Sequence, residues 1–265
     1  MPISVPNYRR NTDRFQFGIL IDITSEYRSP SLRNADRHPS ESASTSKKRC
    51  ETIDKGTQLW RAQLHNEWGP EIVLDNDGHE IDSSIVAYPS KPERMVPRPD
   101  RAKEGRVNPK GIPCLYLSDD RNTAMSEMRP WKGSYVSVAQ FSIVKNLKVV
   151  NCSVDSAQWF FTGIQPAPAK REECVWGSMN RAFSEPVTRD DDIAEYAATQ
   201  VLAEAFHNAG YDGIIYKSGV GHGRSVAVFN PRDAEITNRY VHRVEEVEPK
   251  YSQPIKSILC TLPIA

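Results

Sequence analysis

Five side chains in this sequence have the chemistry to bind a nucleotide and act on it: Arg61, Arg106, Tyr116, Glu127 and Ser218. A guanidinium is a planar fork that matches phosphate oxygens, so either arginine could clamp a pyrophosphate. The tyrosine offers a ring face for stacking and a hydroxyl for orientation. A serine at a strand end could hold a ribose or a base amide. These roles require a fold that brings the five side chains together.

Glu127 would supply the charge that bond cleavage needs. A carboxylate that faces a sugar ring can hydrogen-bond a ribose hydroxyl and stabilise the positive charge that grows at C1′ as a glycosidic bond breaks. With one carboxylate and no predicted metal, this set favours a bond whose leaving group is already good. The N-glycosidic bond of NAD fits, because nicotinamide leaves from a cationic pyridinium and needs no general acid.

Each of these residues also has an ordinary structural interpretation. Taken alone, Glu127 is typical of a solvated helix residue, and the two arginines are typical of surface ion-pair partners. Tyr116 lies in an apolar run that suits a core position, and Ser218 suits a hydrogen bond at a strand end. Taken one at a time, these side chains therefore do not define a site.

A turn and a short strand would carry Arg106 and Tyr116. Asn108-Pro-Lys-Gly111 is typical of a turn, because proline presets φ and glycine tolerates positive φ. Residues 114–117 then predict a short buried strand.

A capped helix would carry Glu127. Ser118-Asp-Asp120 is typical of a helix N-cap, with the first helical turns over residues 123–128. Pro130 ends this helix, since a proline pushes the residue before it out of the α region. The strand and the helix would hold Tyr116 and Glu127 rigidly against one cleft.

Other elements follow from the same patterns. Apolar alternation predicts strands at residues 58–63, 135–143, 147–150, 211–218 and 224–229, with an edge strand near 240–244. The strongest helix spans residues 188–210, with Gly210 at its C′ position. Its acidic run, 190–192, suits a helix cap better than a metal site. Residues 66–105 predict an ordered insertion with a hairpin around Asn76-Asp-Gly78, whereas residues 156–177 predict no regular element.

Composition favours a cytoplasmic protein without metal. The 265 residues carry 34 basic and 34 acidic side chains, so net charge gives no reason to expect nucleic acid or a membrane as a partner. The five cysteines are scattered and odd in number, which argues against a disulfide framework or a zinc site. The start of the sequence lacks the apolar region of a secretory signal. Residues 25–48 are polar and basic, and we expect a solvated arm there after a strand-like run at 16–24.

Six short stretches occur in the order of one known family: Leu59–Ala62, Gly105–Gly111, Leu115–Ser118 with Thr123–Glu127, Tyr196–Leu202, Gly213–Ser218 and Val226–Phe229. The spacing of ten residues from Arg106 to Tyr116, and of eleven from there to Glu127, agrees with that pattern. From about residue 57 to residue 245, the chain therefore resembles the RES-domain family, named for its Arg, Glu and Ser. Its members are toxins of bacterial toxin–antitoxin modules. Val107 stands where the family commonly has tryptophan.

The resemblance implies an α+β fold like that of the ADP-ribosyltransferases. This is a mixed α/β domain in which two packed β-sheets flank an NAD cleft. The catalytic domain would span residues 57–251 and contain the insertion at 66–105. Residues 1–56 would be an N-terminal extension, and residues 252–265 a C-terminal tail.

The resemblance also implies an enzyme that consumes NAD by hydrolysis or phosphorolysis, with ADP-ribosylation of a target in some relatives. Carried over by position, Arg61 and Arg106 would contact the NAD phosphates. Tyr116 would contact the nicotinamide ribose, Glu127 would face the reaction centre and Ser218 would hold the bound nucleotide. Arg106, Tyr116 and Glu127 would be the catalytic residues.

Two other functional classes stay open, an ADP-ribosyltransferase that acts on a protein or nucleic acid and a non-catalytic interaction module. For the leading hypothesis the ligands are NAD as substrate and, in phosphorolysis, inorganic phosphate, with no metal. An antitoxin that blocks the cleft is the implied protein partner. A homodimer is also left open.

Overall fold

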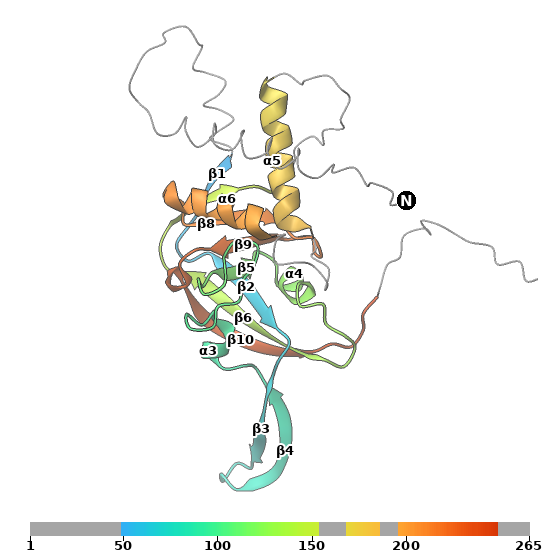
Figure 1. Cartoon of the computed structure of the whole chain (residues 1–265). Helices are drawn as coiled ribbons and strands as arrows, with labels where there is room; N and C mark the ends of the chain where they lie inside the picture. Colours follow the sequence, from blue (N-terminus) through green and yellow to red (C-terminus); the bar gives the residue numbers. More distant parts are fainter. Residues whose placement is uncertain (1–48, 154–167, 186–195, 249–265) are drawn as a thin grey trace, which may run out of the picture.

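The computed structural model describes residues 49–153, 168–185 and 196–248 (Figure 1). The strand predicted at 16–24, the polar arm 25–48, the acidic run 190–192 and the tail 252–265 lie outside these ranges. None of the helices in the described ranges has the length and apolar character that a membrane span requires.

Eight strands form one mixed sheet in the order β1-β7-β8-β9-β5-β2-β6-β10. β7 and β8 pair in parallel, and the other neighbours pair antiparallel. The bounds are β1 Cys50–Ile53, β2 Gln58–Gln63, β5 Leu115–Ser118, β6 Tyr135–Ile143, β7 Leu147–Asn151, β8 Gly213–Lys217, β9 Arg224–Val228 and β10 Ala234–Arg243. The sequence predicted all of these strands except β1, and β10 is the edge strand that it expected. β1 lies inside the range predicted as an N-terminal extension, yet it pairs with β7.

A single residue pair joins the two halves of this sheet, Trp60 of β2 opposite Ser118 of β5. One half contains β1, β7, β8, β9 and β5, and the other contains β2, β6 and β10. One core cluster takes side chains from both halves, among them Phe141 of β6 and Ile215 of β8, so the halves pack against each other. The two packed sheets that we expected are therefore two halves of one continuous sheet.

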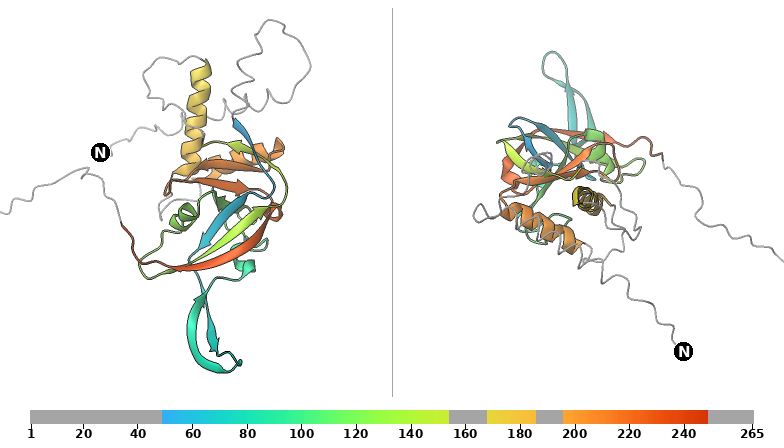
Figure 2. Two further views of the ribbon diagram at one scale, coloured as in Figure 1. Left: turned by 180° about the vertical axis from the view of Figure 1, so that it is seen from behind. Right: turned by 90° about the horizontal axis from the view of Figure 1, so that it is seen from above.

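Helices cover the outer faces of both halves. α4 (Arg121–Ser126) packs on the smaller half, where Ala124 meets Ala62 and Val136. α5 (Pro168–Ser184) and α6 (Ala197–Asn208) lie together on the outer face of the larger half (Figure 2). Phe183 and Phe206 are buried there against Ile214 of β8. The larger half is thus covered on both faces, which explains the continuous apolar runs in β8 and β9.

α5 corrects the sequence analysis, which predicted no regular element over residues 156–177. The helix begins at Pro168, and proline suits a first turn because its missing N–H would have no partner there. The end of the helix predicted at 188–210 is confirmed, since Gly210 adopts a φ of 84° directly after the C-cap of α6. The predicted start of that helix lies outside the described residues.

The predicted hairpin around residues 76–78 is also confirmed. β3 (Glu67–Leu74) and β4 (Glu80–Tyr88) form a separate two-stranded sheet that projects from the body of the protein (Figure 1). Gly78 takes a φ of 85° in the turn, and Asp75 Oδ1 accepts hydrogen bonds from the backbone of Asp77 and His79, both at 2.9 Å. A short helix, α3 (Pro92–Met95), follows.

Candidate functional site

Glu127 lies at the C-terminal end of α4, and its side chain is exposed. Asp120 caps the other end, because its Oδ2 accepts hydrogen bonds from N and Oγ1 of Thr123, both at 2.7 Å. The backbone N–H of Glu127 donates to the carbonyl of Thr123 at 3.0 Å. The predicted cap is therefore confirmed, and one short helix fixes Glu127 relative to the end of β5.

The fold brings Glu127 and Ser218 into direct contact. Ser218 Oγ donates a hydrogen bond to Glu127 Oε1 at 2.6 Å, and Ser225 Oγ donates to the same oxygen at 3.5 Å. Ser218 follows β8 and Ser225 lies in β9, so two adjacent antiparallel strands supply the two hydroxyls. Both bonds are made to Oε1, which orients the carboxylate and leaves Oε2 for another partner. Ser218 was predicted from the sequence as a site residue, whereas Ser225 was not.

Tyr216 is a further member of this group that the sequence analysis did not single out. It lies directly opposite Ser225 in the β8–β9 pair. Its ring stacks on Phe183 of α5 with 5.7 Å between centroids. Burial raises the pKa of its hydroxyl, and the charges of Arg106 and Glu127 act on the same group. Tyr216 could have been found from its position two residues before Ser218, because alternate residues of an extended chain turn their side chains to the same face.

Arg106 lies near this group but binds the end of α5. Its Nη1 donates to the carbonyl of Phe183, and its Nη2 donates to the carbonyl of Glu185. A helix leaves its last carbonyls without partners inside the helix, so a guanidinium is a favourable partner for them. Arg106 therefore holds the C-terminal end of α5 beside Tyr216.

Tyr116 uses its hydroxyl to hold the turn that carries Arg106. The hydroxyl donates to Asn108 Oδ1 at 2.6 Å and accepts from the backbone N–H of Val107 at 3.0 Å. The turn approaches so closely that a Cβ on Gly105 would lie 2.5 Å from the hydroxyl oxygen. Burial raises the pKa of Tyr116 well above its usual range. The described contacts of this hydroxyl are thus with the protein itself.

None of the described contacts joins Arg61 to Glu127. Its Nη1 donates to the backbone carbonyl of Tyr116 at 3.2 Å, and its buried Nε has no hydrogen-bond partner in the described part of the chain. Burial lowers the pKa of the guanidinium. Alternation along β2 turns Trp60 toward α4 and Leu59 toward the core between the sheet halves. Arg61 shares the face of Leu59, so the structure does not bring it to the carboxylate at the end of α4.

The glycine-rich link between β8 and β9 packs against the first turn of α4. A Cβ on Gly221 would lie 2.5 Å from Oγ1 and 2.9 Å from Cα of Thr123. The N–H of Gly223 donates to the same Oγ1 at 2.9 Å. Arg224 fixes the end of the link through Asp119, whose Oδ2 accepts from its Nε at 2.8 Å. Glycine is needed here because any side chain would push the link, and with it Ser218, away from α4.

An open pocket of about 300 Å³ adjoins Ser218. It is lined by Ser153, Lys217, Ser218, Gly221, His222, Gly223 and Arg224. Its volume is at the lower end of the range for small-molecule sites, which is roughly 300–1,000 Å³. In the three described ranges, no cluster of His, Cys, Asp or Glu side chains could hold a metal ion.

Comparison with known proteins places the chain in a family. A sequence model of the RES domain matches residues 81–248, which is more than half of the chain. The chain belongs to the RES domain family. The matched range contains Arg106, Tyr116, Glu127 and Ser218, whereas Arg61 lies before it.

Two further comparisons complete this result. The crystal structure of the M. tuberculosis MbcT–MbcA toxin–antitoxin complex is similar to this RES-domain protein with a TM-score of 0.40 and 14% sequence identity. The similarity covers 74% of this chain and 88% of that chain. No curated protein sequence matches the chain.

Proposed function

We propose that this RES-domain protein cleaves the bond between nicotinamide and ribose in NAD, by hydrolysis or phosphorolysis. We further propose that it is the toxin of a bacterial toxin–antitoxin or defence system, with an antitoxin as its protein partner. Membership of the RES domain family supports both proposals, since the resemblance described above implies NAD-consuming toxins. The observation that carries the enzymatic proposal is the carboxylate of Glu127, which is exposed and oriented by Ser218 and Ser225.

The chemistry of this arrangement suits a reaction that passes through an oxocarbenium-like state. Nicotinamide leaves as a neutral base from a cationic pyridinium, so positive charge shifts onto the ribose as the bond lengthens. A carboxylate fixed beside C1′ stabilises that charge without having to move, which is the main source of electrostatic catalysis. The two serine hydroxyls hold Oε1, so Oε2 would face the ribose. Water or phosphate would then take the ADP-ribose.

The pocket beside Ser218 supports binding of one part of NAD rather than of the whole dinucleotide. The imidazole of His222 can donate a hydrogen bond to a phosphate or ribose oxygen there. The oxygens of Ser153 and Ser218, whose protons are donated to Asn151 and Glu127, can accept hydrogen bonds from ribose hydroxyls. Arg61 and Arg106 stay proposed phosphate contacts. For Arg106 such a contact would replace its present bonds to the carbonyls at the end of α5.

Incubation of the pure protein with labelled NAD, with and without phosphate, tests the reaction class. Release of free nicotinamide with no labelled macromolecule is expected, and a requirement for phosphate would identify phosphorolysis. Label transferred from NAD to a protein or nucleic acid would instead support an ADP-ribosyltransferase. NAD that stays intact at high protein concentration would contradict catalysis and support an interaction module. Growth arrest on expression in bacteria, with relief by Glu127→Gln, tests the toxin proposal.

A further inference from the structure

The β3–β4 hairpin is amphipathic, although it packs on the body only at its base. Residues that face each other in an antiparallel pair share one face of the ribbon. The pairs Trp68 with Ala87, Pro70 with Ile85 and Ile72 with Ser83 therefore lie on one face. Beyond the bulge near the turn, Leu74 continues this face along β3 and Ile81 continues it along β4. Ser83 is the polar residue within what we call the apolar face, and Glu80, which pairs with Leu74, is the charged residue at its turn end.

The opposite face of the hairpin is more polar. It carries the acidic side chains Glu67, Glu71 and Asp82, together with Ser84 and the smaller apolar set Val73, Val86 and Tyr88. Most of the large apolar side chains of the hairpin are thus on one face, which is what a strand pattern shows when one face is covered and the other meets water. The sequence pattern of the hairpin therefore predicts that its apolar face packs against another surface.

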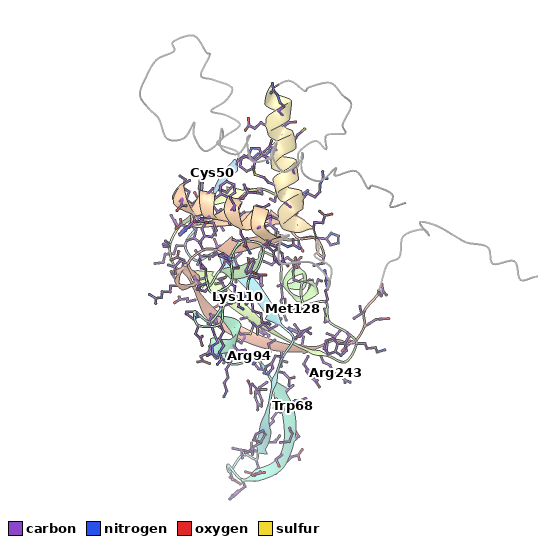
Figure 3. All side chains as sticks on the ribbon, viewed as in Figure 1. Cys50, Trp68, Arg94, Lys110, Met128 and Arg243 are labelled. Atoms are coloured by element: carbon purple, nitrogen blue, oxygen red, sulfur yellow. The ribbon has the colours of Figure 1, made fainter. Side chains whose placement is uncertain are left out.

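The described part of the chain provides no such cover. Exposed fractions are 58% for Trp68, 52% for Ile72, 55% for Leu74, 63% for Ile81 and 67% for Ile85. Trp68 lies where the hairpin leaves the body and makes an edge contact with Tyr135, at 5.3 Å between centroids (Figure 3). Single exposed apolar residues are common, but a contiguous exposed patch of this kind marks an interaction surface. An isolated two-stranded hairpin is also only marginally stable in water.

We propose that the apolar face is covered by the same face of a second copy of this chain. The face carries a charge only at its turn end, at Glu80, so two copies related by a two-fold axis can place their apolar side chains against each other. Packed face to face, the hairpins would form a small four-stranded sandwich with its layers about 10 Å apart. Glu67, Glu71 and Asp82 of both copies would then point outward into water.

The area of the face agrees with a reversible dimer. Each large aliphatic side chain contributes on the order of 100 Å² of apolar surface, and tryptophan contributes more. The five exposed side chains would therefore bury about 500 Å² on each copy, or roughly 1,000 Å² in total. This is near the lower limit for a specific interface and suits a dissociation constant in the micromolar range. An anionic membrane is a poorer partner, because it would repel Glu80 on the face and the three acidic side chains behind it.

The hairpin projects from the end of the body opposite to α5 (Figures 1 and 2). Pairing through this hairpin therefore leaves the surface beside α5, Tyr216 and Ser218 open. The proposal is independent of the proposed enzymatic function, since neither Glu127 nor its partners take part in it.

Sedimentation velocity on the full chain from about 1 to 100 μM tests the proposal. The wild-type protein should change with concentration from a 29.9 kDa monomer toward a dimer of twice that mass. Ile85→Asp should weaken dimerisation at least tenfold, because it places a charge in the centre of the face. Ser84→Asp, at the neighbouring position on the opposite face, is the matched control and should dimerise like the wild type. Circular dichroism of both variants checks that the body is folded.

A cross-linking experiment gives a second readout. Oxidised Ser83→Cys should form a covalent dimer that Ser84→Cys does not form. A wild-type protein that stays monomeric at 100 μM would overturn the proposal. So would an Ile85→Asp variant that dimerises as well as the wild type, or wild-type binding to anionic vesicles that Ile85→Asp abolishes.

Discussion

The contacts of Tyr116 lead to a prediction that separates a structural role from a chemical one. Its hydroxyl bridges the backbone N–H of Val107 and the side chain of Asn108, and so holds the turn that carries Arg106. Tyr116→Phe keeps the ring in place and removes only this bridge. We therefore expect a less stable protein whose Arg106 turn is held less firmly.

The size of the destabilisation by Tyr116→Phe follows from the two groups that lose their hydrogen-bond partner. The N–H of Val107 belongs to a buried residue and would be left without an acceptor, which costs about 1–3 kcal/mol. Asn108 Oδ1 would lose one donor, worth about 1 kcal/mol, although its amide keeps its bonds to three backbone carbonyls. A total of about 2–4 kcal/mol corresponds to a fall in Tm of about 4–16 °C for a domain of this size.

Thermal unfolding measured by circular dichroism, together with NAD kinetics, provides the assay. Tyr88→Phe is the matched control, because its hydroxyl donates to the carbonyl of Pro70 at 3.1 Å on the exposed hairpin. The control should change Tm by no more than about 2 °C, since exposed positions contribute within roughly 0.5 kcal/mol. A Tyr116→Phe variant with unchanged Tm but greatly reduced NAD turnover would refute this reasoning. That result would mean that the hydroxyl acts on the substrate rather than on the turn.

Two further predictions concern Arg106 and the buried thiols. Arg106→Ala should lower the free energy of unfolding by about 2–3 kcal/mol, because it removes two charged hydrogen bonds to the carbonyls at the end of α5. A urea titration that shows no change in this free energy would contradict the role of Arg106 in holding α5. Burial raises the pKa of Cys114 and of Cys152 from 9.0 to about 12. Between about pH 9 and 12 the unfolded state releases protons that the folded state keeps, so the free energy of unfolding should fall as the pH rises through this window. Urea titrations at pH 8 and pH 10 measure this fall in the free energy of unfolding. The fall should be smaller in Cys152→Ala. An equal fall in that variant would contradict the assignment of the pH dependence to the buried thiol of Cys152.

Local patterns in the sequence were sufficient to predict most individual elements. The Asp120 cap, the hairpin turn at Gly78 and the helix end at Gly210 were all predicted, because each depends on a few neighbouring residues. The family pattern assigned Glu127 and Ser218 to one site, but their direct hydrogen bond was not predicted. Without that pattern, nothing in the sequence relates two side chains that lie 91 residues apart.

Features that depend on distant contacts were not predictable. The continuity of the sheet depends on one pair, Trp60 with Ser118, which no local pattern indicates. α5 was missed because the prolines at 166 and 168 and the aromatic residues around them obscure a helical pattern that only packing on β8 makes clear. The sequence also could not show that Arg106 bonds to the end of α5, since those acceptors are backbone carbonyls.

The most direct test of the proposed function is the rate of nicotinamide release from NAD by Glu127→Gln. This variant keeps the shape of the side chain and removes its negative charge. Glu93→Gln, at an exposed position on α3, is the control for removal of a carboxylate elsewhere. We predict that Glu127→Gln stays folded and loses about two orders of magnitude or more in turnover, as expected for a central electrostatic group, while the control keeps the wild-type rate. Turnover by Glu127→Gln equal to that of the wild type would contradict the assignment of Glu127 as the reaction centre.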